Sequence, residues 1–342
     1  MDDLLSVEDL FEASGRYGYL HPSYAEAFVE IGEVRHLRRS GAWLLTRAIP
    51  GSDRRDALVG HPLLVCRDWR ALSDDLAETA ALADVVTVSA LTDPLAPLGE
   101  EMLRDAFVDV VRVHAQHFVV DLPTFWPSRD HRRAVRQAAE LVDIDIEESP
   151  TGRLDEWERL SSGPGGVDAA ADTVGASAET LGLSREALER QLAVPGCVGI
   201  TALAEDGPVA MAIAYVSGDD AHIHHVASSE QGEQLGAVYA VYAAAVEDMA
   251  GRGLRRLDLG AAAALDTDAA EAASRFMAGW TELTLPSYRC GRIIDRVAYD
   301  ALAAAAGTTG SATFPAYRDP TTATLGAADT IGPSTPSIGD DA

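Results

Sequence analysis

Residues 221–292 hold three consecutive runs that decide the fold: Ala221-His-Ile-His-His-Val-Ala227, Gln231-Gly-Glu-Gln-Leu-Gly236 and Leu254-Arg-Arg-Leu-Asp-Leu-Gly260. The first and third runs are rich in apolar residues, and each predicts a β-strand. The middle run predicts a glycine-bearing loop that feeds a helix ending near Gly251. A loop between a strand and a helix suits an anionic ligand, because the backbone N–H groups at the helix start face that ligand.

The composition is that of a globular chain with room for about two domains. The chain has 342 residues, of which 47% are hydrophobic and 24% are charged. It contains no apolar run of the roughly 18 residues that a membrane helix requires. The start, Met1-Asp-Asp-Leu-Leu5, lacks the basic and apolar regions of a signal peptide. We therefore expect a cytoplasmic protein without membrane insertion.

The net charge of −27 limits the partners that the chain can bind. All 27 basic residues are arginine, so no lysine can serve as a base or a phosphate anchor. A continuous basic face for DNA is excluded, and any anionic partner must use local arginine clusters. Cys66, Cys197 and Cys290 are far apart, which predicts buried apolar residues and no metal site.

One arginine cluster lies on a helix that Ser128 can cap. Arg132 and Arg136 are one turn apart, share a face, and can grip phosphates. The alternative is a solvated helix face whose charges balance nearby carboxylates.

The chain divides into two mixed α/β (α+β) units and a tail. Two prolines in Leu122–Pro127 break any continuous element, so we place the boundary there and predict units over 1–126 and 127–302. Residues 303–342 are rich in small and polar residues and predict a disordered tail. In the first unit we expect a helix over Met1–Ser14 and a hairpin at Ser40–Gly41. We also expect separate strands over 108–113 and 116–121.

Four motifs resemble those of Fem-type (FemAB-like) aminoacyl and acyl transferases of the GNAT superfamily. They are the Ser128–Ala138 helix, the hairpin around Gly218 followed by His224-His225, the strand end Leu257-Asp-Leu-Gly260, and Arg275-Phe-Met-Ala-Gly-Trp280. The resemblance covers about residues 17–300. It implies two tandem GNAT-like domains with a cleft between them. It also implies an amine acceptor and a co-substrate donor, aminoacyl-tRNA or acyl-CoA, with no tightly bound cofactor.

The resemblance also points to Arg275, Phe276 and Met277 as site residues. The family carries lysine where this chain has Met277. If that lysine polarises the acyl carbonyl, its loss costs about 10²–10³ in rate unless another group substitutes. Arg275 is the nearest candidate substitute.

Further candidates come from the opening stretch. His224 and His225 are candidate bases for removing the proton of the amine, although a strand histidine can also be a hydrogen-bonded structural residue. Asp258 is a candidate base or partner of the base, or else a cap of the following loop. Gln231, Gly232 and Gly236 are candidate donor-binding residues, because they loosely resemble the pyrophosphate loop of acetyl-CoA enzymes. An ordinary strand-to-helix turn is the alternative for them.

The sequence therefore predicts an N-acyltransferase. The main hypothesis is transfer of an aminoacyl group from aminoacyl-tRNA to the amine or hydroxylamine of a small molecule or peptide, in specialised metabolism such as antibiotic biosynthesis, or in cell-wall precursor synthesis. The alternatives are an acyl-CoA-dependent GNAT N-acyltransferase and a non-catalytic GNAT-like binding protein.

Overall fold

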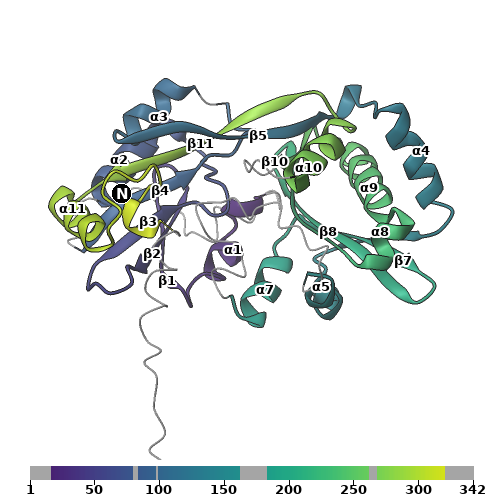
Figure 1. Ribbon diagram of the computed structural model, residues 1–342, viewed down its shortest axis with the longest axis horizontal. Coiled ribbons are helices and arrows are strands. Elements are labelled where there is room, and N and C mark those ends of the chain that lie inside the picture. The colour runs from purple at the N-terminus through teal and green to yellow at the C-terminus, as the bar shows by residue number, and fades with distance from the viewer. Residues whose placement is uncertain (1–16, 80–83, 98, 162–182, 262–267, 320–342) are drawn as a thin grey trace, which may run out of the picture.

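A computed structural model describes residues 17–79, 84–97, 99–161, 183–261 and 268–319. The helix predicted over Met1–Ser14 lies outside these residues. The described chain forms one mixed sheet flanked by helices, as the α/β prediction requires (Figure 1). No helix among the described residues is long and apolar enough to span a membrane.

The sheet has eleven strands in the order β1-β2-β3-β4-β11-β5-β10-β9-β8-β7-β6. The strands are β1 (Gly32–His36), β2 (Trp43–Ala48), β3 (Arg55–Val59), β4 (Val85–Leu91), β5 (Val110–Asp121), β6 (Asp143–Glu148), β7 (Cys197–Ala204), β8 (Gly207–Ser217), β9 (Asp220–Ser228), β10 (Arg256–Ala261) and β11 (Thr284–Ile293). All neighbouring pairs are antiparallel except β3 with β4 and β9 with β10.

The α-helices fill the connections between the strands. They are α1 (Pro22–Glu26), α2 (Leu72–Thr79), α3 (Glu100–Ala106), α4 (Arg129–Ala138), α5 (Leu154–Ser161), α7 (Arg185–Leu192), α8 (Glu230–Leu235), α9 (Ala237–Gly251), α10 (Asp268–Ala278) and α11 (Arg296–Ala305). Each parallel strand pair is joined through helices, because parallel strands need a crossover connection. The crossover after β3 contains α2, and the crossover after β9 contains α8 and α9.

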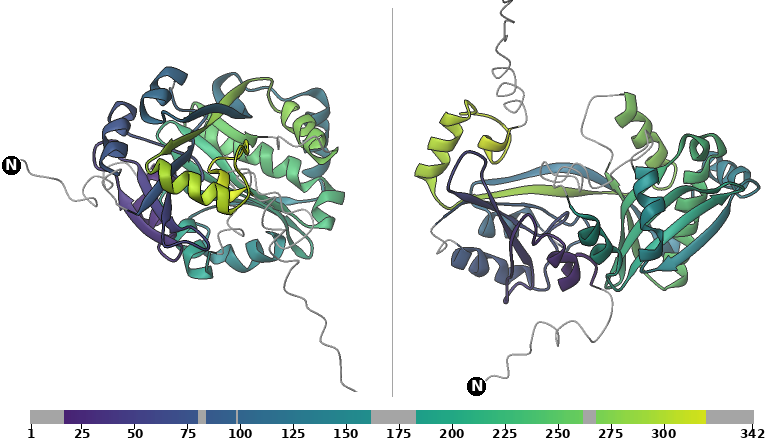
Figure 2. Two further views of the ribbon diagram at one scale, coloured as in Figure 1. Left: turned by 60° about the vertical axis from the view of Figure 1, so that its left-hand side comes forward. Right: turned by 90° about the horizontal axis from the view of Figure 1, so that it is seen from below.

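The two halves of the sheet repeat one pattern and exchange one strand each. Antiparallel strands lead to a parallel pair, β3 with β4 or β9 with β10, and an antiparallel strand follows that pair. In the first half this last strand is β11, from the end of the chain, whereas in the second half it is β5. β5 and β11 also pair with each other and run side by side between the halves (Figure 2). The repeat agrees with the two GNAT-like units expected from the sequence.

Local sequence signals explain most of the elements. Ser128 caps α4 by accepting a hydrogen bond from the backbone N–H of His131, and Ser184 caps α7 in the same way. The hairpin at Ser40–Gly41 joins β1 to β2, and Gly41 adopts a φ of 73°, which a residue with a side chain rarely takes. The three cysteines are buried and unpaired, as predicted.

Two local expectations differ from the structure. The strands expected over 108–113 and 116–121 are one continuous strand, β5, because Val110–Asp121 pairs along its length with β11 and β10. The glycine-bearing run that starts at Gln231 is helical, and forms most of α8.

The segment expected to be disordered is packed from 303 to 319. Phe314 is buried against Gly291 of β11, and the Tyr317 hydroxyl is 2.7 Å from the Thr87 hydroxyl of β4. Arg318 forms an ion pair with the buried Asp56. These contacts offset the cost of ordering that the composition alone predicts. Residues 320–342 lie outside the described part of the chain.

The start of α4 packs tightly against the end of α10. The imidazole of His131 is buried and donates from Nε2 to the backbone oxygen of Phe276 at 2.8 Å. It lies edge-on to Trp280, with ring centroids 5.0 Å apart. A Cβ added at Gly279 would be 1.9 Å from Cε1 of His131. Only glycine therefore fits at position 279 without displacing the imidazole.

We predict that Gly279→Ala lowers the free energy of unfolding by about 1–3 kcal/mol, because the added methyl group overpacks the site. The matched control is Gly251→Ala in α9, where an added Cβ meets no atom within 4 Å. The control should be neutral or slightly stabilising, by up to about 1 kcal/mol. Thermal unfolding followed by circular dichroism measures both variants. Equal stability of the two variants would contradict the packing described for Gly279.

Candidate functional site

The parallel strands β9 and β10 separate shortly after they start to pair. Their register covers only Asp220–His222 of β9 and Arg256–Asp258 of β10, although β9 continues to Ser228. Opposite β8, the register of β9 shifts so that His224 has no partner, which marks a β-bulge. The β9 edge beyond His222 is therefore not paired with β10. In open α/β sheets, ligands bind outside the carboxyl ends of strands at such openings.

In the described part of the first half, β3 and β4 show no comparable opening. The parallel register of β3 and β4 extends from Arg55 to Leu58, over most of β3. The candidate site therefore lies in the second half, between β9 and β10.

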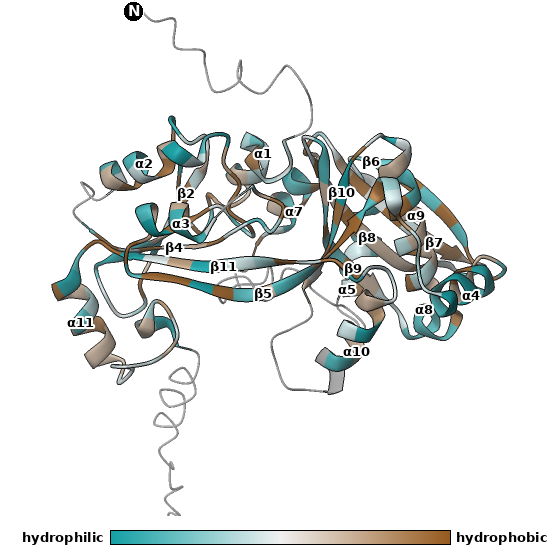
Figure 3. Ribbon diagram, turned by 90° about the horizontal axis from the view of Figure 1, so that it is seen from above, coloured by the Kyte–Doolittle hydropathy of each residue, from teal (hydrophilic) through white to brown (hydrophobic). Residues whose placement is uncertain are grey.

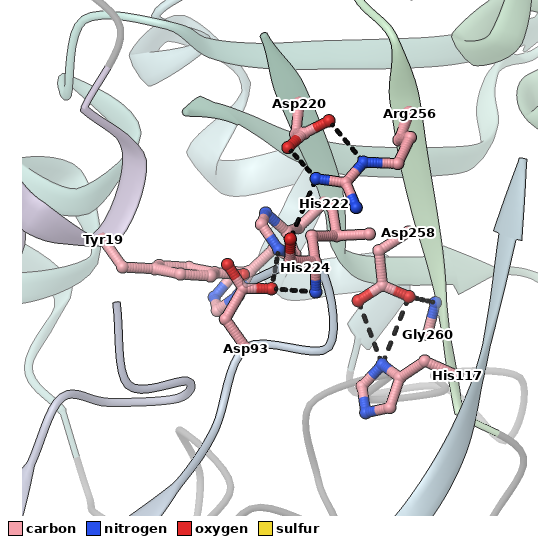
Figure 4. Close-up of polar contacts among 10 residues, drawn as sticks. Tyr19, Asp93, His117, Asp220, His222, His224, Arg256, Asp258 and Gly260 are labelled. Atoms are coloured by element: carbon pink, nitrogen blue, oxygen red, sulfur yellow. Dashed lines mark hydrogen bonds and ion pairs between the residues drawn. The ribbon is translucent and has the colours of Figure 1, made fainter. Parts of the chain in front are cut away.

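Polar side chains, most of them buried, gather where β9 and β10 begin to separate (Figure 4). They come from both halves of the sheet and include three ionisable pairs. These are His117 of β5 with Asp258 of β10, Asp93 after β4 with His222 of β9, and Asp220 of β9 with Arg256 of β10.

His117 and Asp258 form the pair with the clearest acid–base geometry. Nδ1 of His117 is 3.0 Å and 3.2 Å from the two carboxylate oxygens of Asp258. The Gly260 N–H donates to the same carboxylate at 2.9 Å. Burial alone would raise the pKa of Asp258, but the facing His117 and His222 and this N–H outweigh burial and lower the pKa. Asp258 is therefore an anion that holds the proton of His117 on Nδ1.

Nε2 of His117 is the atom available for proton transfer. Within the described residues it has no hydrogen-bond partner, and it is not among the fully buried polar atoms that lack one. A neutral imidazole with Nδ1–H held by a carboxylate presents a lone pair on Nε2, which is the arrangement of a general base.

His222 links the two halves of the sheet. Its Nε2 donates to Asp93 at 2.9 Å, and both side chains are almost fully buried. Burial alone would lower the pKa of His222, but the Asp93 carboxylate more than compensates and the pKa is raised. Arg256 forms a bidentate ion pair with Asp220 and also donates to the backbone oxygen of Leu95 at 2.8 Å. The contact of Asp93 with His222 and that of Leu95 with Arg256 hold the segment after β4 against β9 and β10.

His224 and His225, which the sequence singled out, lie beside this cluster. Nδ1 of His224 is 3.1 Å from the Tyr19 hydroxyl, and burial holds the pKa of His224 well below its usual value. His224 is therefore neutral near pH 7. The His225 ring contacts the rings of His224 and Trp157 at centroid distances of 4.1 Å and 5.5 Å.

The predicted donor loop takes a different form in the structure. Ser229 caps α8, and Gln231 is exposed on that helix. Gly232 is buried, and a Cβ there would be 2.3 Å from the Val209 backbone oxygen, so this glycine allows α8 to pack on β8. Gly236 adopts a φ of 67° between α8 and α9. The glycines therefore shape the turn from α8 into α9.

Among the described residues, the side chains of Arg275, Phe276 and Met277 form no hydrogen bond or ion pair with the polar cluster. Arg275 is exposed and pairs with Glu271 of its own helix. The Phe276 ring packs against Tyr239 and Tyr242 of α9. Met277 is buried in the core beneath α9. In this chain the segment anchors α10 to α9, and Met277 is part of that packing.

Arg132 and Arg136 lie on the outer side of the second half. Arg132 donates to the Pro127 backbone oxygen at 2.5 Å, and Arg136 is exposed. α4 is hydrophilic along its length (Figure 3). Other arginines, such as Arg153 and Arg252, form ion pairs with carboxylates. Within the described residues, no such pair involves the arginines of α4.

Sequence reasoning found Asp258 and His224 but missed His117, Asp93 and His222. The alternation of His222 and His224 on one strand was a usable signal for His222. His117 and Asp93 carry no local signal, because they meet their partners 141 and 129 residues away. Among the described residues, no group of three or more potential ligands could hold a metal ion.

Residues 128–277 match the sequence model of the acetyltransferase (GNAT) domain. A comparison with curated protein sequences gives no match. Among solved structures, FemX is 12% identical, with a TM-score of 0.59, over 82% of this chain and 93% of that one. The C-terminal domain of a putative lysylphosphatidylglycerol synthetase from Agrobacterium fabrum is 17% identical, with a TM-score of 0.51, over 80% and 88%. A conserved protein of unknown function from Bacteroides thetaiotaomicron is 10% identical, with a TM-score of 0.53, over 81% and 92%.

At these identities the solved structures are informative about the fold alone. The similarity to FemX extends over both halves of the chain, whereas the matched domain lies in the half that contains the strand opening. The resemblance stated from the motifs is confirmed: residues 128–277 match an acetyltransferase (GNAT) domain, and the fold of the chain is similar to that of FemX.

Proposed function

We propose that the protein transfers an aminoacyl group from aminoacyl-tRNA to the amine, or hydroxylamine, of a small molecule or peptide. The observation that carries this proposal is the opening between β9 and β10, with the His117–Asp258 pair at its start. The acceptor amine would approach from the side of Asp93 and Tyr19, where the polar cluster lies.

Each step of the reaction has a residue or backbone group to support it. The neutral amine attacks the carbonyl carbon of the donor, and its proton passes to Nε2 of His117. Backbone N–H groups on the β9 edge beyond His222, which do not pair with β10 in the described part of the chain, can hold the developing oxyanion. A C–N bond forms, the ester bond to the tRNA breaks, and the leaving oxygen takes up a proton. His117 can return the proton to this oxygen, because Asp258 holds the imidazole in place through Nδ1.

A polyanionic donor is favoured by the arginines of α4. In a chain with a net charge of −27, most cations are needed by nearby carboxylates. The α4 arginines instead present unneutralised charge, which attracts phosphates. The donor is a co-substrate rather than a tightly bound cofactor.

Acyl-CoA is the second candidate donor, and the turn at Gly236 favours it. Gly236 is the N-cap of α9, and the backbone N–H groups at the start of this helix could meet a pyrophosphate. Acyl-CoA also carries fewer phosphates than tRNA, which suits the acidic surface.

Ligand-dependent stability separates these donors. We predict that aminoacyl-tRNA raises the unfolding temperature of the full chain more than coenzyme A does, because a ligand of the native state stabilises it. Arg132→Ala with Arg136→Ala should abolish this shift without changing the unfolding temperature of the free protein. Arg104→Ala is the matched control, since Arg104 is an exposed arginine of α3 that pairs with Glu100. A shift with coenzyme A alone would favour acyl-CoA, and a shift with neither ligand would count against both donors.

We predict that His117→Gln lowers kcat for transfer to a panel of primary amines by about 10²–10⁴, with little change in KM for the donor. The reason is that glutamine cannot accept the proton of the amine. Asp258→Asn should also lower kcat, because it no longer fixes the Nδ1–H form of the imidazole. Mass spectrometry of the products provides the rates.

The control for this experiment is His114→Gln on the same strand. His114 is half-exposed and lies near Arg289, outside the polar cluster. Circular dichroism checks that each variant is folded. Wild-type kcat in folded His117→Gln would remove His117 from the mechanism.

A further inference from the structure

A large open pocket lies beside the start of α4. Its volume is about 570 Å³, and its walls come from the end of β5, the segment before α4, and the connection from α10 to β11. Aromatic side chains line it, namely Phe125, Trp126 and Trp280. Neither the acid–base cluster nor the strand opening uses this pocket.

Trp126 is the most unusual residue of the pocket. It is 75% exposed, although an indole ring normally gains stability from burial. The guanidinium of Arg132 lies 4.8 Å from the centroid of this ring and is held by the Pro127 backbone oxygen. Trp126 therefore presents an aromatic surface to solvent in a fixed position, next to a positive charge.

The charge beside Trp126 extends along α4. Arg129, Arg133 and Arg136 are exposed, and within the described residues no carboxylate pairs with them. From Arg129 to Arg136 the helix rises by about 10 Å. A row of arginines of this length can contact several successive phosphates of a nucleic-acid strand. A single pyrophosphate would contact the arginines at only one end of the row.

We propose that Trp126 and the α4 arginines form a binding surface for single-stranded RNA, with one base stacked on Trp126 and the backbone along α4. Exposed aromatic rings combined with arginines are the usual means of binding single strands. Asp121 and Glu282 also line the pocket, and carboxylates can accept hydrogen bonds from the amino groups of adenine and cytosine.

This inference rests on the proposed function, because it assigns the surface to the single-stranded 3′ end of the donor tRNA. β5 connects the pocket to the reaction site. Asp121 lines the pocket and His117 lies four residues earlier on the same strand, about 13 Å away at the rise of a strand. A strand end bound at Trp126 is thus close enough for its terminal nucleotides to reach the opening between β9 and β10.

The test uses a fluorescently labelled RNA of about ten nucleotides that ends in CCA, as tRNA does. Fluorescence anisotropy at fixed salt measures its Kd for the full chain. Trp126→Ala should weaken binding about 10-fold or more, whereas Trp126→Phe should largely restore it, because stacking needs an aromatic ring. Arg133→Ala should reduce the slope of log K against log salt by roughly 0.7. Arg104→Ala on α3 should bind as the wild type does.

The outcomes separate this inference from the proposed function. If folded Trp126→Ala binds the RNA as tightly as the wild type while charged tRNA still supports transfer, the inference is overturned and the function stands. If Trp126→Ala weakens binding of coenzyme A but not of RNA, the surface belongs to a CoA nucleotide and the inference is again overturned. If the wild type transfers only from acyl-CoA and binds no RNA, both proposals fail.

Discussion

The early separation of β9 from β10 is the constraint on which the rest of the site depends. Parallel strands normally satisfy each other's backbone groups, and here the register stops at His222 and Asp258. Beyond that point the β9 edge is unpaired with β10, which leaves donors for a substrate. Where the two strands separate, buried polar side chains of neighbouring strands face one another. Each ionised group there requires a partner, because an unpaired buried charge is strongly destabilising.

The exchange of β5 and β11 between the halves supplies those partners. β5 precedes the second half in the chain but pairs with β10, and this brings His117 to Asp258. The segment after β4 contributes Asp93 to His222 in the same region. The site is consequently assembled from both halves, so the first half is needed even though its own parallel strands do not open. This explains why a domain matched over residues 128–277 alone would lack its candidate base.

Local features of the structure could be predicted from the sequence, whereas contacts between residues far apart in the sequence could not. The cap at Ser128 was predicted because a capping hydroxyl acts within one helical turn. The run from Gln231 was wrongly predicted to be a loop because its glycines were taken as a loop signal. Gly232 instead lies in a helix and is small because its backbone packs closely against Val209. His117 was missed because the pairing of β5 with β10 leaves no periodic signal in either strand.

The two faces of the second half of the sheet carry side chains of different chemistry. Leu257 and Leu259 of β10 pack into the core beneath α9, and Asp258 between them points to the opposite face of the sheet, where it contacts His117. α4 packs against α9, whereas His222 lies between Ala221 and Ile223, which pack into the core with α9, and so points to the opposite face of the sheet. A donor held by α4 and an acceptor held near Asp93 would therefore approach from opposite faces. They can meet only where the sheet is open, between β9 and β10, and this is where His117 is available to take the proton.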